Sequence, residues 1–245
     1  MSFRGLKEGV ENNLFTVIYP WVSLWGGIAG LIISMNWGGV KSVLGKAFGA
    51  FSLGLLGQAF GQICYSYYIY ILKIEVPYPS IGDIGFFATG IFYAFGSIQL
   101  MKATGAKFSI RSYGGKAIAI IIPILWALGS YYFFLRGYSF DWSNPLVVVL
   151  DLISPIIDSV YLSLSILTFL LSRKFLGGLI RYPILLLLIA IVAEAVSDFT
   201  FLYQESRELW YVGGLNDYMY LVTYALMTLA LLQLGKLFNK VTEVR

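Results

Sequence analysis

Four acidic residues lie inside long apolar stretches of this 245-residue chain: Asp151, Asp158, Glu194 and Asp198. No Lys or Arg occupies a comparable depth in those stretches. A carboxylate at the centre of a bilayer costs about 2.5–3.5 kcal/mol on insertion scales, so an intramembrane acid is a candidate for function. These four residues are therefore the first candidates for the chemistry that the protein performs.

Helical spacing puts these acids on shared faces with other polar side chains. Asp151 and Asp158 are seven residues apart, and Glu194 and Asp198 are four apart, so each pair shares one face of a helix. Further polar residues recur at helical spacing in other apolar stretches or at their first turns. We predict that one polar pocket, open to the outside, is formed by Asp83, Asp151, Asp158, Glu194, Asp198, Asp217, Tyr220, Tyr224, Gln58 and Gln62.

Three kinds of chemistry could use these carboxylates. Protonated acids donate hydrogen bonds to neighbouring hydroxyls and amides, which suits a structural or sensory role. Oxygen ligands also suit hard cations such as Na⁺ or Ca²⁺, and buried acids can carry protons. Alternatively, Asp198 and Glu194 could act as acid and base on a lipid-like substrate positioned by Tyr224. The residues themselves leave these alternatives open and assign no catalytic group.

Composition excludes several classes of protein. Histidine is absent and Cys64 is the single cysteine, which removes the usual ligands of haem, zinc and iron–sulfur clusters and any internal disulfide. We therefore expect no cofactor other than a bound cation or lipid, and no dedicated metal site. Charged residues make up 12% of the chain, against about 25% in soluble domains. A water-soluble fold is excluded, and membrane topology accounts for the net charge of +4 without nucleic acid.

Apolar runs of the length that crosses a bilayer, about 20 residues, occupy most of the chain. They predict an all-α polytopic membrane protein: a seven-transmembrane-helix bundle, with residues 1–245 as a single domain and no leader to be removed. Gly57 and Gly61 have a small-xxx-small spacing that favours close packing of the second helix against a neighbour. The predicted helices are Thr16–Met35, Ala47–Leu72, Ile84–Met101, Ala117–Leu135, Leu146–Leu171, Tyr182–Tyr203 and Tyr218–Leu237.

Seven helices also separate the charges outside them onto two faces. One face collects five basic residues and eight acids, while the other holds Glu243 as its single acid beside twelve basic residues. By the positive-inside rule the N-terminus is expected outside and the C-terminus in the cytoplasm, in a prokaryotic plasma membrane. The twelve basic residues are Lys41, Lys46, Lys102, Lys107, Arg111, Lys116, Arg173, Lys174, Arg181, Lys236, Lys240 and Arg245.

The segment Pro77-Tyr78-Pro79-Ser80-Ile81-Gly82-Asp83 resembles the P-[FY]-P-S-x-x-D lead-in to a membrane helix in multi-pass sensor regions of bacterial diguanylate cyclases and histidine kinases. The stretches Asp151–Asp158 and Glu194–Asp217 resemble the same regions. The resemblance implies a sensory or ligand-binding module. Those sensors continue into a cytoplasmic output domain, whereas this sequence stops at Arg245, so we expect a separate cytoplasmic signalling partner.

A weaker similarity supports one alternative, and a comparison with another seven-helix family fails. Ser197-Asp198 and Thr223-Tyr224 are similar to residues of lysoplasmalogenase-type membrane hydrolases, which implies a lipid hydrolase. Microbial rhodopsins also have seven helices, but retinal requires a Lys in the middle of the last one, and here only Lys236 is present, at its end. The leading expectation is a bilayer-embedded sensor for a small molecule, ion or lipid. A hydrolase and a proton- or cation-coupled transporter are the alternatives.

Overall fold

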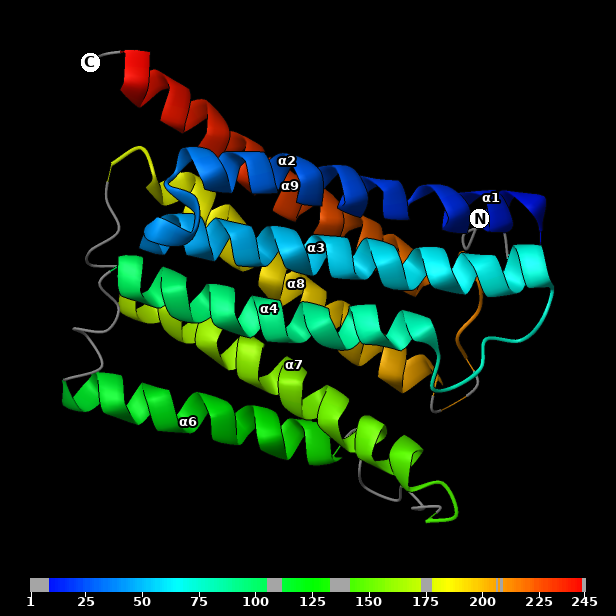
Figure 1. Cartoon of the computed structure of the whole chain (residues 1–245). Coiled ribbons are helices and arrows are strands. Elements are labelled where there is room, and N and C mark those ends of the chain that lie inside the picture. The colour runs from blue at the N-terminus through cyan, green and yellow to red at the C-terminus, as the bar shows by residue number, and fades with distance from the viewer. Residues whose placement is uncertain are drawn as a thin grey trace.

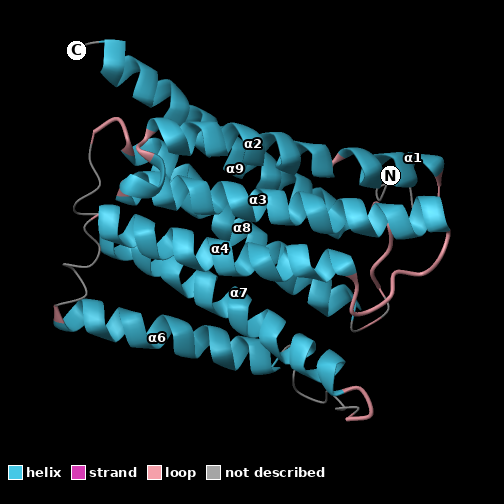
Figure 2. Cartoon of the chain, in the orientation of Figure 1, coloured by secondary structure: helices cyan, strands magenta, loops and turns pink. Residues whose placement is uncertain are grey.

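The computed structural model describes residues 9–104, 112–132, 142–172, 178–205, 207 and 209–243. Within these ranges the chain is helical and contains no strand, as Figure 2 shows. Seven helices are long and apolar enough to cross a membrane, which confirms the predicted helix count. They extend over Val10–Asn36, Val43–Leu72, Ile81–Ala103, Tyr113–Ser130, Pro145–Leu171, Arg181–Glu205 and Leu215–Glu243.

The first and second spans are each built from two consecutive pieces. In the first span, α1 (Val10–Ile18) passes into α2 (Pro20–Asn36) at Tyr19, where Pro20 takes the first helical position. A short 3₁₀ turn, η2 (Gly39–Lys41), leads from α2 into the second span, in which α3 (Val43–Ser66) continues as one π-helical segment, η3 (Tyr67–Leu72). The remaining spans are single helices: α4 (Ile81–Ala103), α6 (Tyr113–Ser130), α7 (Pro145–Ser172), α8 (Arg181–Glu205) and α9 (Leu215–Glu243).

Most helices extend beyond the apolar runs that predict them. The first span starts at Val10 instead of Thr16, and α9 continues to Glu243 instead of ending at Leu237. Polar residues in these extensions are good enough helix formers to continue the backbone hydrogen bonding where the chain leaves the apolar region. Leu135, the predicted end of the fourth helix, lies outside the described residues.

The helices run between two ends of the bundle that differ in charge. In Figure 1, α1, α4, α7 and α9 begin at one end, here called the acidic end, and α3 and α8 begin at the opposite, basic end. The described basic residues of the predicted cytoplasmic face belong to the basic end: Lys41, Lys46, Lys102, Lys116, Arg181, Lys236 and Lys240. Eleven of the charges used in that assignment lie outside the described residues: Arg4, Lys7, Glu8, Lys107, Arg111, Arg136, Asp141, Arg173, Lys174, Glu208 and Arg245. Which end faces the cytoplasm stays a prediction.

Large apolar side chains cover the outside of the bundle. Trp25, Ile91, Ile121, Leu125 and Leu229 are all more than half exposed. Such a surface is unfavourable in water and matches the hydrocarbon of a lipid bilayer. The protein is therefore a multi-pass membrane protein.

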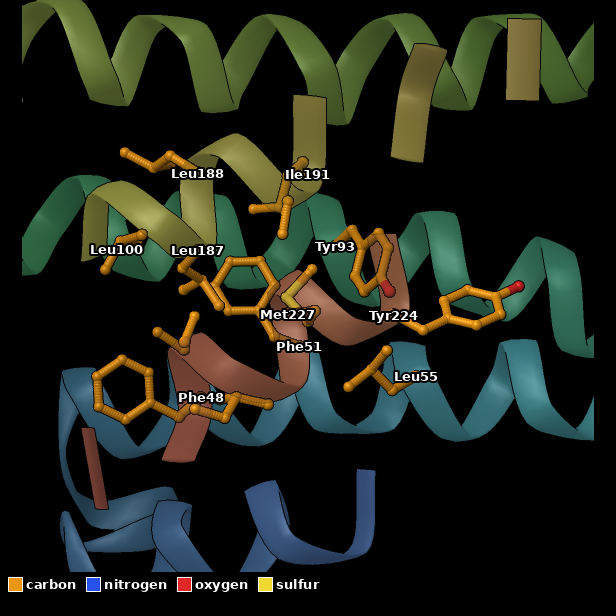
Figure 3. Packing of buried hydrophobic residues seen from close by; sticks show 14 of the residues in the cluster. Phe48, Phe51, Leu55, Tyr93, Leu100, Leu187, Leu188, Ile191, Tyr224 and Met227 are labelled. Carbon is orange, nitrogen blue, oxygen red and sulfur yellow. The ribbon is translucent and has the colours of Figure 1, made fainter. Parts of the chain in front are cut away.

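The interior of the bundle changes character between its two ends. Toward the basic end it is filled by apolar side chains, and Figure 3 shows Phe48, Leu100, Leu187 and Leu188 packed there. Toward the acidic end buried tyrosines and polar groups replace them, beginning with Tyr93 and Tyr224 in the same view. The polar half of the core holds the candidate site.

Candidate functional site

Glu194 lies at the centre of the site and has no exposed surface. The Gln58 side chain of α3 donates a hydrogen bond from Nε2 to Glu194 Oε1 at 2.6 Å. In turn, Gln58 Oε1 accepts a hydrogen bond from the Tyr224 hydroxyl of α9 at 3.1 Å. The amide is oriented so that its donor meets a carboxylate and its acceptor meets a hydroxyl. One glutamine thus joins α3, α8 and α9 through buried hydrogen bonds.

Asp198 lies one turn further along α8 and binds two tyrosines. The Tyr161 hydroxyl of α7 donates to Oδ2 at 2.5 Å, and the Tyr220 hydroxyl of α9 donates to Oδ1 at 2.9 Å. Each carboxylate oxygen therefore has its own donor, as an ionised carboxylate requires. Asp198 links α7, α8 and α9 in the way that Gln58 and Glu194 link α3, α8 and α9.

Asp158 of α7 completes the group. Its side chain is 8% exposed and has no hydrogen-bond partner in the described part of the chain. Asp198 acts on it electrostatically, and Asp158 acts on Glu194 in the same way. Among the described residues, the charged neighbours of these acids are other carboxylates and never a Lys or Arg. We call the group the carboxylate cluster: Asp158, Glu194, Asp198, Gln58, Tyr161, Tyr220 and Tyr224.

Tyr93 of α4 is a neighbour of the cluster that the sequence does not identify. Its ring is fully buried and meets the Tyr161 ring edge-on, with the ring centroids 5.8 Å apart. Glu194 and Asp198 both lie within electrostatic range of its hydroxyl. Tyr161 is also outside the predicted pocket, although it follows Asp158 at helical spacing on the polar face of the same helix. One tyrosine among 18 carries no distinguishing signal unless an acid stands at helical spacing beside it.

Two of the predicted site residues accept backbone hydrogen bonds at the starts of helices. Asp217 of α9 accepts from the backbone N–H of Gly213 at 2.6 Å, and the Thr16 and Tyr19 hydroxyls approach it to 3.5 Å. Gly213 has φ of +71°, which a residue with a side chain adopts only under strain. Asp83 of α4 accepts from the Tyr65 hydroxyl at 2.7 Å and from the backbone N–H of Ser80 at 2.5 Å. Both acids satisfy N–H groups that a helix start leaves unpaired.

The remaining candidates lie nearer the acidic end than the cluster. Asp151 accepts a hydrogen bond from the Tyr78 hydroxyl at 2.7 Å, and Gln62 is half-buried one turn beyond Gln58. The structure therefore brings together Asp158, Glu194 and Asp198 with Gln58, Tyr220 and Tyr224, and gives Asp83, Asp151 and Asp217 separate partners at the acidic end.

Replacing Tyr78 by Phe tests the link between the α3–α4 loop and α7. Burial and the bond to Asp151 raise the pKa of Tyr78, so this contact stabilises the fold below pH of about 10 and the stabilisation is lost above it. Because Tyr78 is half exposed, we expect Tyr78→Phe to lower the free energy of unfolding by at most about 1 kcal/mol near neutral pH. Denaturation at pH 7 and above pH 10 measures the effect. The matched control is Tyr67→Phe at an exposed position, and equal losses in both variants would contradict the prediction.

An apolar groove lies beside the cluster without including it. It has a volume of about 650 Å³ and is formed by α6, α7 and α8, with Trp126 stacked on Phe199 at a centroid distance of 5.5 Å. Its other lining residues include Ser130, Ile166, Thr200 and Tyr203, and none of the lining residues is a carboxylate. A lipid chain in this groove would therefore touch no cluster acid.

Within the described residues, no three His, Cys, Asp or Glu side chains are placed to bind one metal ion. Two of the acids instead accept from neutral donors: Gln58 donates to Glu194, and Tyr161 and Tyr220 donate to Asp198. Comparison with protein-family models, curated proteins and solved structures finds no match to this chain. The resemblance to bacterial sensor regions and the similarity to membrane hydrolases accordingly stay predictions.

Proposed function

We propose that this protein is a sensory or ligand-binding module of the membrane, in which the carboxylate cluster receives the ligand and a separate cytoplasmic partner reads the response. The observation that carries the proposal is the cluster's position between helices. Its side-chain hydrogen bonds join α3, α7, α8 and α9 at one buried point. A ligand that alters the charge there acts on the packing of four helices at once.

The distribution of polar side chains around the cluster supports a sensor over a transporter. Polar side chains continue from the cluster to the acidic end through Asp151 and Asp217, whereas Leu187, Leu188 and Leu231 fill the core toward the basic end. Transport requires the central site to open alternately to both sides. A sensor needs access from one side only, and the one-sided polar core is consistent with that requirement.

The response would arise as a shift between two packings of the same helices. Adding a positive charge at Glu194 or Asp198 weakens these acids as hydrogen-bond acceptors for Gln58, Tyr161 and Tyr220. Pro155 lies inside α7 between Asp151 and Asp158, where it removes one backbone hydrogen bond and eases bending of the helix. α9 carries the change to Lys236 and Lys240 at the basic end, where a partner with an acidic surface would bind.

The test compares Glu194→Gln and Asp198→Asn with Glu205→Gln, which makes the same charge change at an exposed position of α8. Each protein is reconstituted in lipid nanodiscs, and hydrogen exchange of α8 and α9 is followed by mass spectrometry over series of pH and salt. We expect exchange in the wild-type protein and in Glu205→Gln to change with conditions. We expect the two cluster variants to lose most of that change because the responding charge is gone.

Two results would overturn the proposal. The first is a wild-type protein whose exchange does not respond, or cluster variants that respond as Glu205→Gln does. The second result concerns transport. We expect no flux driven by a proton or cation gradient in proteoliposomes. Gradient-driven flux that Glu194→Gln abolishes would assign the cluster to a transporter instead.

A further inference from the structure

Two buried oxygens beside the cluster have no hydrogen-bond partner among the described residues: Glu194 Oε2 and the hydroxyl of Tyr93. Both residues have no exposed surface. Figure 3 shows the Tyr93 ring among the core side chains, with its hydroxyl inside the bundle. Buried polar atoms nearly always have a partner, and each exception calls for an explanation such as a bound ion or water. These two atoms therefore point to a ligand.

No described Lys or Arg lies among the charged neighbours of these oxygens. Asp158, also without a hydrogen-bond partner in the described part of the chain, acts electrostatically on Glu194, as Asp198 does. Gln58 already donates to Glu194 Oε1, and Tyr161 and Tyr220 already donate to Asp198, which leaves the Tyr93 hydroxyl as the donor nearby that is not engaged among the described residues. A water molecule would fill the hydrogen-bonding need but leave the negative charge in place. A cation meets both needs.

The available atoms select the kind of cation. Carboxylate and hydroxyl oxygens suit hard ions. Ca²⁺ takes six to eight oxygens, several of them from carboxylates, whereas here no three acids of the described residues are placed around one ion. A proton on Glu194 Oε2 would be a hydrogen-bond donor without an acceptor among the described residues. A monovalent metal ion held by one carboxylate and neutral oxygens fits these constraints.

On the basis of the proposed function, we propose that the ligand is a monovalent metal ion such as Na⁺, bound by Glu194 Oε2 and the Tyr93 hydroxyl. The site then takes one oxygen each from α8 and α4, and Asp198 of α8 acts electrostatically on both residues. Na⁺ neutralises Glu194 without breaking its bond to Gln58. The bound ion would join α4 to α8 through the Tyr93 hydroxyl, which has no hydrogen-bond partner of its own among the described residues.

The experiment measures equilibrium binding of ²²Na⁺ to the full chain in nanodiscs at constant pH and constant ionic strength, with K⁺ and N-methylglucamine as competitors. We expect saturable binding by the wild type that Na⁺ displaces and N-methylglucamine does not. Tyr93→Phe keeps the ring and removes one ligand, so its affinity falls about tenfold or more. Glu194→Gln abolishes binding. Ser163→Ala removes another buried hydroxyl without a partner, outside the cluster, and leaves the affinity unchanged.

Binding no stronger than that of N-methylglucamine, or equal binding by Glu194→Gln, would overturn the sodium site. Far-UV circular dichroism and gel filtration test whether each variant is folded. If Glu194→Gln does not fold, Tyr93→Phe gives the decisive comparison. The sodium site and the proposed function fail separately. Hydrogen exchange that responds to pH in a protein without ²²Na⁺ binding removes the sodium site alone. Sodium binding without any change in α8 or α9 leaves the site and removes the sensor.

Discussion

Replacing Gln58 by Leu lowers the free energy of unfolding by about 2–4 kcal/mol, since the change strands two buried groups at once. Glu194 Oε1 loses the donor that it has at 2.6 Å, and the Tyr224 hydroxyl loses its acceptor. A leucine of similar size fills the space but satisfies neither atom. Unfolding in nanodiscs or mixed micelles, followed by circular dichroism, measures the loss.

The control for this prediction lies one turn away on the same helix. Gln62→Leu makes the same substitution at a half-buried position, and we expect a change within about 0.5 kcal/mol. The double variant Gln58→Leu with Glu194→Leu should recover part of the loss, because the stranded carboxylate is then also removed. Equal destabilisation by Gln58→Leu and Gln62→Leu would show that the hydrogen bonds of Gln58 contribute nothing specific.

The second large effect is expected at the contact between α3 and α4. A Cβ atom on Gly57 would lie 2.7 Å from the backbone oxygen of Gly85 and 2.6 Å from Thr89 Oγ1. A backbone atom has no rotamer by which to move away, so Gly57→Ala forces the two helices apart. We expect a loss of about 1–3 kcal/mol, the usual cost of overpacking, measured by the same unfolding experiment.

At a glycine with free space around it, substitution by alanine should change the stability in the opposite direction. A Cβ on Gly129 of α6 meets nothing within 4 Å, so Gly129→Ala should raise stability by up to about 1 kcal/mol through the unfolded state. A loss in both variants would contradict the steric explanation.

The effect at Gly57 should also reach the site, because the neighbouring Gly54 faces the Tyr93 ring. Moving α4 displaces that ring from Glu194, and ²²Na⁺ binding should weaken in Gly57→Ala.

Part of the site was predictable because its chemistry is visible along the chain. Asp158, Glu194 and Asp198 are conspicuous because acids are costly in apolar stretches, and Gln58, Tyr220 and Tyr224 follow from helical spacing. Tyr93 has no such signal, since a tyrosine inside an apolar helix is equally suited to packing. Tyr161 follows Asp158 at helical spacing, which places it on the polar face of its helix but does not reveal its contact with Asp198. Their role depends on which helix faces α8, and spacing along one helix carries no information about its neighbours.

Asp83, Asp151 and Asp217 illustrate the same difference at the acidic end. Their charge predicted a place in the polar pocket, yet each has its own partner: Tyr65, Tyr78 and the backbone of Gly213. Asp83 and Asp217 stand at helix starts, where an acid finds unpaired N–H groups nearby, and such local bonds compete with a distant cluster. Asp151 instead meets a tyrosine of the α3–α4 loop.

The amino-acid sequence by itself determined the seven membrane helices and the acids that need an explanation, because bilayer thickness and the cost of burying charge act on each segment separately. The tertiary structure alone decided which oxygens meet. Gln58 reaches Glu194 across 136 residues and Tyr224 across 166, and Tyr93 stands beside them with its hydroxyl unpaired among the described residues. Those meetings depend on the rotation and order of packed helices, which are set by the fit of many side chains at once.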